Sequence, residues 1–154
     1  MACDVVVADT IRIPSDAVDP TVKNFGRLDF VNALFEAYDR DADYAVLLDD
    51  KGCVTEGRGW NIFALKGGVL TSPDRGVLEG ITRKTVLELS DALNIEGRLA
   101  RLPVAGLRCA DEVFLSGNMM KVPPVTGFDG TVYQTGPLTR RARALYWDWA
   151  ASQQ

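Results

Sequence analysis

The chain of 154 residues has the length of one ordinary domain, and its 47% hydrophobic and 25% charged residues are typical of a folded globular protein rather than a disordered one. The 17 basic and 21 acidic side chains give a net charge of −4, which argues against nucleic acid or an anionic membrane as a partner and favours a small molecule or a protein. Histidine is absent, which excludes triads built on histidine, so acid–base chemistry must use Lys, Asp, Glu, Tyr or Cys.

The N-terminal part of the chain predicts a strand followed by a helix. The segment CDVVVADTIRI, residues 3–13, is rich in β-branched residues and is followed by two prolines, as is typical of a strand that ends in a turn. Between residues 23 and 40, apolar side chains recur at the spacing of one helical face. The members of that face are Leu28, Val31, Leu34, Phe35 and Tyr38.

The middle of the chain predicts two hairpins. Residues 43–57, DYAVLLDDKGCVTEG, give an apolar strand, a turn at Asp50-Lys51-Gly52 and a short return strand that ends at Glu56. Residues 60–73, WNIFALKGGVLTSP, give a second hairpin that turns on Gly67-Gly68.

The remainder mixes helices and strands. A helix is predicted from about Ile81 to Leu93, and Pro137 opens a last helix in which Leu138, Ala142, Leu145 and Trp149 are aligned. Between the two helices, EGRLARLPV, DEVFLSG and PPVTGFDGTVYQTG predict extended segments. Strands outnumber helices, and hairpins alternate with connections through helices. We therefore expect an α+β, or mixed α/β, fold in a single domain over residues 1–154.

Two residues in turns could carry chemistry. Lys23 follows a proline-set turn, where a lysine is usually a solvated amine, although it becomes a Schiff-base amine if its neighbours lower its pKa. Glu56 stands between a β-branched pair and a glycine turn at the mouth of an apolar strand. It is either an acid exposed to water or the partner of a cationic ring nitrogen, since opposite charges favour both ionised forms.

Two segments could bind an anion. After Gly80, the free amides of Ile81 and Thr82 begin a helix, and with the Thr82 hydroxyl they could hold a phosphate; alternatively, Thr82 only caps the helix. Ser116, Gly117 and Asn118 follow an apolar strand directly and could present successive amides to the same anion.

Other patterns argue against alternative classes of function. DRDADY has acids at alternate positions but lacks the glycine of a calcium loop, and the arginines of TRRARAL are typical of a solvated helix face. Cys3, Cys53 and Cys109 are widely spaced, so we expect reduced thiols and no metal site. The sequence has no bilayer-spanning run and no signal-peptide pattern, which predicts a cytoplasmic protein.

Six ordered blocks of the sequence resemble the class IV (fold type IV) aminotransferases, which use pyridoxal phosphate and include branched-chain amino acid, D-amino acid and (R)-amine transaminases. The blocks read IPSDAVDPTVKN, LFEAYDR, TEGRGWNIF, TSPDRGVLEGITRKTV, DEVFLSGNMMKVPPVTGFDG and GPLTRRARALYW. The resemblance implies the large C-terminal cofactor-binding domain of that family, with mixed sheets or a pseudo-barrel and flanking helices. LSGNMMKVPPVTGFDG is most similar to the branched-chain members.

The resemblance also implies roles for the candidate residues. The lysine at the position of Lys23 is the catalytic residue, which forms the internal aldimine with pyridoxal 5′-phosphate and moves a proton between substrate and cofactor. Glu56 falls on the acid that faces the pyridine nitrogen and keeps it protonated. The phosphate would be bound by Ile81, Thr82, Gly117 and Asn118. An amino donor and then a 2-oxo acid would complete the two halves of a transamination.

The chain departs from the family pattern at three points. Asn118 stands where many relatives have a threonine, and Arg27 occupies the neighbourhood in which several relatives place an aromatic residue after the lysine. The sequence begins where the second domain of the family starts. We therefore expect the smaller N-terminal domain to be absent, together with an arginine that usually grips the phosphate.

These departures leave several functions open. The chain could be the large domain of a transaminase, as a fragment, a truncated reading frame or half of a split enzyme. It could instead be a non-catalytic relic or interaction module, or a lyase similar to aminodeoxychorismate lyase. Family members are homodimers, so the resemblance implies a homo-oligomer with amino acid and 2-oxo acid substrates, and an exposed apolar surface that promotes self-association or poor solubility.

Overall fold

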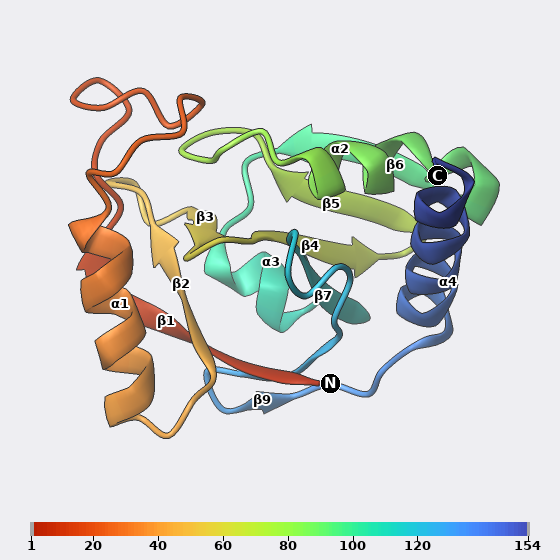
Figure 1. The fold of residues 1–154 in the computed structure, drawn as a ribbon. Helices are drawn as coiled ribbons and strands as arrows, with labels where there is room; N and C mark the ends of the chain where they lie inside the picture. Colours follow the sequence, from red (N-terminus) through yellow and green to blue (C-terminus); the bar gives the residue numbers. More distant parts are fainter. Residues whose placement is uncertain (1, 154) are drawn as a thin grey trace.

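The N-terminal strand lies in the middle of a five-stranded mixed sheet. In the computed structural model, which describes residues 2–153, β1 (Cys3–Ile11) pairs in parallel with β2 (Tyr44–Leu48) and with β8 (Val125–Phe128). The strands β3 (Val54–Gly57) and β9 (Thr131–Val132) add antiparallel at the edges, so the order is β3-β2-β1-β8-β9. Helix α1 (Leu28–Asp39) connects β1 to β2 (Figure 1).

A second sheet has four strands in the order β6-β5-β4-β7. It contains the hairpin of β4 (Asn61–Lys66) and β5 (Val69–Pro73), with β6 (Glu96–Ala100) parallel to β5 and β7 (Glu112–Ser116) antiparallel to β4. Both residues of the turn, Gly67 and Gly68, have positive φ, which explains why glycine occupies the two positions. Helix α2 (Ile81–Glu88) follows β5, α3 (Val104–Arg108) precedes β7, and α4 (Pro137–Ser152) ends the chain.

Three hydrophobic clusters hold these elements in layers. The first lies between α1 and the strands β1 and β2, and the second lies between the two sheets. Along β4 the side chains alternate: Ile62 and Ala64 belong to the inter-sheet cluster, whereas Phe63 and Leu65 belong to a third cluster with α2 and α4. The layers are therefore α1, the five-stranded sheet, the four-stranded sheet, and α2 with α4 (Figure 1). The predicted mixed α/β class is confirmed.

The first helix differs from its prediction. It begins at Leu28, and its buried residues are Asp29, Phe30, Ala33 and Ala37. Leu28, Phe35 and Tyr38, predicted from their spacing to form its apolar face, are exposed to 73%, 60% and 57%. Ala33, Ala37 and the large Phe30 pack on β1 and β2, and the three exposed apolar residues are left on the outer side.

The second helix is shorter than predicted. It ends at Glu88, and a separate 3-10 turn covers Asp91–Leu93. The Ser90 hydroxyl donates to the carbonyl of Leu87 between the two. Val86 of the helix and Leu93 of the 3-10 turn are both buried. Among residues 2–153, no helix has both the length and the apolarity needed to cross a bilayer.

Candidate functional site

All the predicted site residues line one cavity of about 470 Å³. Its walls come from the loop before α1, the β3–β4 turn, the start of α2, the end of β7 and Tyr146 of α4. The predicted residues on these walls are Lys23, Glu56, Ile81, Thr82, Gly117 and Asn118. The fold thus brings together candidates that lie far apart in the sequence, at the seam where β3 of one sheet turns into β4 of the other.

Glu56 is a buried carboxylate with one oxygen that has no hydrogen bond. The residue is only 3% exposed, because it lies on β3 and is covered by the loop that leads to α2. Its Oε2 accepts hydrogen bonds from the Leu78 amide at 3.0 Å and from Nδ2 of Asn61 at 3.1 Å. Its Oε1 has no hydrogen-bond partner within residues 2–153. Burial raises the pKa of Glu56 from 4.5 to about 7, although the Leu78 N–H and nearby arginines oppose the shift.

Arg12 and Asp29 extend this carboxylate into a buried charge cluster. Nη1 of Arg12 lies 2.6 Å from Oδ2 of Asp29, and Nη2 lies 3.6 Å from Oε1 of Glu56. The guanidinium also lies over the ring of Phe30, 4.4 Å from its centroid. One fixed cation therefore sits between two buried acids, and its charge favours the ionised form of Glu56.

Asn61 joins the Glu56 strand to the loop before α2. The same Nδ2 that donates to Glu56 also donates to the carbonyl of Leu78 at 2.9 Å. A Cβ at Gly80 would collide with Oδ1 of Asn61 and would displace that side chain from its present position. Asn61 thereby fixes the start of α2 relative to the carboxylate.

The N-terminus of α2 faces the cavity without a side-chain cap. Gly80 is the N-cap residue, and no side chain bonds to the first-turn amides. Thr82 is the second residue of the helix, so the prediction that it only caps the helix is wrong. Arg83 anchors this end of the helix instead, through bonds from its guanidinium to Ser72 Oγ at 3.0 Å and to the carbonyl of Pro73. Uncapped amides at a helix N-terminus favour an anion.

The segment after β7 offers a different set of donors from the one predicted. The amide of Gly117 donates to the carbonyl of Lys121 at 3.0 Å, so it is not free for an anion. Gly117 is nevertheless needed, because a Cβ there would lie 2.7 Å from the carbonyl oxygen of Gly59. Ser116 pairs with Asn61 across the strands, and its Oγ is buried without a partner in the described part of the chain. This face of the β4–β7 pair thus presents an unused hydroxyl beside Asn61, the residue that donates to Glu56.

Lys23 and Arg27 line the cavity from the segment that precedes α1. Lys23 lies in an exposed loop whose turns are held by bonds such as Val18 N–H to Pro14 C=O, and its ammonium makes no ion pair with residues 2–153. Arg27 precedes α1, and its Nε donates to the carbonyl of Asn24 at 2.8 Å.

Sequence reasoning missed three residues of the site: Arg12, Asp29 and Asn61. It named Ser116 for its backbone amide and not for its hydroxyl. Some partners of the three missed residues are distant in the sequence, as Glu56 is from Arg12, and a pairing such as Arg12 with Asp29 leaves no periodic signal. A charged residue at the end of an apolar strand, as in VVVADTIRI, was the available hint for Arg12.

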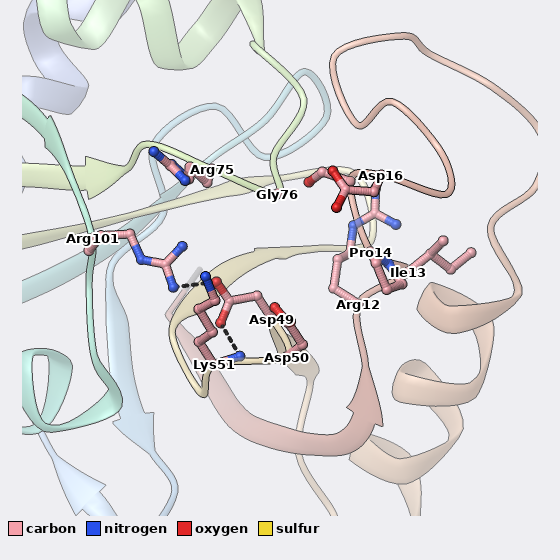
Figure 2. Close-up of a pocket in the computed structure, with 11 residues that line it drawn as sticks. Arg12, Ile13, Pro14, Asp16, Asp49, Asp50, Lys51, Arg75, Gly76 and Arg101 are labelled. Carbon is pink, nitrogen blue, oxygen red and sulfur yellow. Dashed lines mark hydrogen bonds and ion pairs between the residues drawn. The ribbon is translucent and has the colours of Figure 1, made fainter.

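A second cavity of about 160 Å³ lies behind Arg12 and contains none of the predicted residues. Figure 2 shows Arg101 paired with Asp49, at 2.6 Å, and the Lys51 amide donating to the same carboxylate. These bonds close the β2–β3 turn, so Asp49 has a structural role.

The sequence is similar to a known family over most of its length. Residues 3–128 match the family described as "Amino-transferase class IV". A "Putative branched-chain-amino-acid aminotransferase" of Methanocaldococcus jannaschii is 39% identical over 142 residues, which are 89% of this chain and 49% of that protein.

Solved structures agree in fold. A branched-chain amino acid aminotransferase from Thermobaculum terrenum in its PLP form superposes with a TM-score of 0.95 at 28% identity, over 100% of this chain and 52% of that one. The branched-chain aminotransferase of Thermoproteus uzoniensis with norvaline gives a TM-score of 0.91 at 34% identity, over 95% of this chain and 50% of that one. The chain thus spans about half the length of these relatives.

Proposed function

The chain belongs to the class IV aminotransferases, and from this premise we propose that it binds pyridoxal 5′-phosphate and takes part in amino transfer between an amino acid and a 2-oxo acid. The observation that carries the proposal is the shared cavity of Lys23 and Glu56, an amine and a buried carboxylate with one unsatisfied oxygen. Branched-chain substrates are supported by the names of the relatives.

The residues of the cavity fit this cofactor. Oε1 of Glu56 is a buried acceptor that lacks a donor, and a protonated ring nitrogen would supply one. The uncapped amides of Ile81 and Thr82 suit a phosphate, and Oγ of Ser116 is a further free donor in the same cavity. Asn118 can add its own amide, whereas Gly117 contributes close packing and not its N–H.

When bound, pyridoxal phosphate supplies an aldehyde carbon for amino groups and a ring that accepts an electron pair. Lys23 would provide the amine at Nζ that condenses with the aldehyde carbon with loss of water and, when free, would carry the proton from the substrate Cα to the cofactor. Glu56 would hold a proton on the ring nitrogen through Oε1. Arg12 favours the ionised form of Glu56 that this hydrogen bond requires.

The test is direct. The purified chain is mixed with pyridoxal phosphate, reduced with borohydride and mapped for a phosphopyridoxyl group, with Lys23→Ala and the exposed Lys84→Ala as a matched pair. We expect a label on Lys23 that is lost only in Lys23→Ala, together with visible absorption before reduction.

Amino transfer from leucine, isoleucine and valine to 2-oxo acids is measured with the same preparations. A chain that takes no label at Lys23 would contradict the proposal and favour a non-catalytic role. If Lys23 is labelled but no amino transfer is detected, the cofactor site stands and amino transfer requires a longer protein. If Lys23→Ala still transfers amino groups, the proposed role of Lys23 is wrong.

A further inference from the structure

The second cavity, the one lined by Arg12, is large enough for a small organic molecule. Its volume is about 160 Å³, whereas roughly 10–15 Å³ measured in the same way suffices for one water. Its walls come from the segment after β1, the β2–β3 turn, the loop after β5 and Arg101 after β6 (Figure 2). None of the residues that line it also lines the Lys23–Glu56 cavity. A ligand bound here would therefore leave the proposed cofactor site free.

Arg12 gives this cavity a buried donor that lacks an acceptor. The residue is only 6% exposed, and its Nη1 is bonded to Asp29. Its Nε has no hydrogen-bond partner within residues 2–153. Figure 2 shows the Arg12 side chain beside Asp16 on one side of the cavity. Since a buried N–H without an acceptor is costly, an oxygen of a ligand that reached Nε would be bound favourably.

The other charges around the cavity have both signs, and four of them are unpaired. Asp49 and Arg101 neutralise each other at 2.6 Å. The remaining acids and cations on the walls form no ion pair with residues 2–153, and these are Asp16, Asp50, Lys51 and Arg75. Unpaired acids disfavour a ligand that carries only negative charge, and unpaired cations disfavour one that carries only positive charge. The lining is therefore complementary to a small molecule with one charge of each sign.

We propose that this second cavity binds a small zwitterion with one carboxylate and one ammonium group, as in a free α-amino acid. The carboxylate accepts the hydrogen bond of Arg12 Nε and faces the charge of Arg75, which Figure 2 shows on the side away from Arg12. The ammonium donates to Asp16. Because Nη2 of Arg12 lies 3.6 Å from Glu56, the zwitterion site borders the charge cluster of the other cavity.

The experiment measures binding to the chain without cofactor by ligand-observed NMR. The probes are valine, 3-methylbutanoate, which lacks the ammonium of valine, and 2-methylpropan-1-amine, which lacks its carboxylate. Arg75→Gln and Asp16→Asn each remove one exposed contact and leave the buried Arg12 in place. The controls Arg140→Gln and Asp148→Asn make the same changes at exposed positions of α4. Thermal unfolding checks that each variant is folded.

We expect valine to bind the wild type, and each of its two analogues to bind at least about tenfold more weakly. Arg75→Gln and Asp16→Asn should each weaken the binding of valine by about fivefold or more, because each loses a charge-assisted contact. The two α4 controls should stay within about twofold of the wild type.

Three results would overturn the inference. The first is that valine does not bind, or that an analogue binds as well as valine, which for 3-methylbutanoate would indicate a simple anion site. The second is that either Arg75→Gln or Asp16→Asn binds valine as the wild type does, which would place valine elsewhere, for example in the Lys23–Glu56 cavity. The third is an equal loss in the controls.

The zwitterion site and the proposed function can fail separately. If valine binds through Arg75 and Asp16 but Lys23 takes no phosphopyridoxyl label, only the proposed function is contradicted. If Lys23 is labelled and valine binding is the same in both cavity variants and the wild type, only the zwitterion site is contradicted.

Discussion

At the residue scale, Glu56 combines deep burial with incomplete hydrogen bonding. Two donors satisfy Oε2, while Oε1 has only the charge of Arg12 at 3.6 Å. A buried carboxylate in this state is costly when ionised, which is why its pKa is raised to about 7. Oε1 of Glu56 can therefore accept a hydrogen bond from a cationic donor.

This carboxyl makes the stability of the cofactor-free chain depend on pH. The folded-state pKa lies near 7 and the ordinary value is 4.5, so the folded chain binds the proton more tightly than the unfolded chain. Stability from this group is present below pH 4.5 and is lost as pH rises to about 7. The expected loss is on the order of 3 kcal/mol.

The matched variant is Glu56→Gln, which keeps the size and cannot ionise. Urea unfolding of both chains at about pH 5 and about pH 8, on either side of the raised pKa, gives the comparison. The wild type should lose stability relative to Glu56→Gln over that interval, because every other carboxylate is common to both. If the difference in unfolding free energy between the wild type and Glu56→Gln is the same at both pH values, the raised pKa of Glu56 is contradicted.

Arg12 is expected to matter more to folding than any surface arginine. Arg12→Gln removes the cation bonded to Asp29 and leaves two buried acids near each other, which should destabilise the chain by about 3–5 kcal/mol. Arg108→Gln, which breaks the exposed pair with Asp129, should cost less than about 1 kcal/mol. Chemical denaturation measures both, and Asp29→Asn added to Arg12→Gln should recover part of the loss. If Arg12→Gln and Arg108→Gln lower the unfolding free energy equally, the stabilising role of the buried Arg12–Asp29–Glu56 charge cluster is contradicted.

At the element scale, the cavity depends on how closely β7 approaches the β3–β4 turn. Gly117→Ala would place a methyl group 2.7 Å from the backbone oxygen of Gly59, so the two segments must separate. We expect a loss of about 1–3 kcal/mol in unfolding free energy, together with weaker binding of pyridoxal phosphate. Gly26→Ala is the control, because its Cβ would meet only Asn24 Oδ1 at 3.5 Å. If Gly117→Ala is as stable as the wild type and binds pyridoxal phosphate with the same affinity, the close contact between Gly117 and Gly59 is not needed for the cavity.

The hairpins could be predicted from the sequence because their turns are local. Gly52, Gly67 and Gly68 all have positive φ, and each turn joins strands that are adjacent in the sequence. The outer and inner faces of α1 could not be assigned in the same way. Leu28 and Phe35 have the right spacing for burial, but the sheet accepts the small side chains of Ala33 and Ala37 instead.

The same limit applies to the site. Lys23 and Glu56 could be chosen as candidates because each lies within a short, recognisable stretch, and both line the same cavity. The bonds of Arg12 to Asp29 and of Gly117 N–H to Lys121 C=O follow from tertiary approach and local turn geometry, which no residue pattern reports. The second bond is why the predicted run of successive amides after β7 is not available to an anion.

At the scale of the whole molecule, the outer face of α1 is an apolar surface that the fold leaves uncovered. Leu28, Phe35 and Tyr38 lie at helical spacing and are all more than half exposed, while the inner face of α1 is filled by the sheet. Exposed apolar surface of this kind promotes association. We therefore propose that the chain forms homo-oligomers through this face, in line with the dimer expected from the family resemblance.

The prediction is that Phe35→Lys reduces self-association and improves solubility without lowering the unfolding temperature, since the side chain is not part of the core. Val132→Lys adds the same charge at an exposed site on β9, at an edge of the five-stranded sheet, and should leave association unchanged. Light scattering across a concentration series separates the two variants from the wild type. If the wild-type chain is monomeric at every concentration tested, the proposed interface is wrong, because the apolar face of α1 is then stable in contact with water.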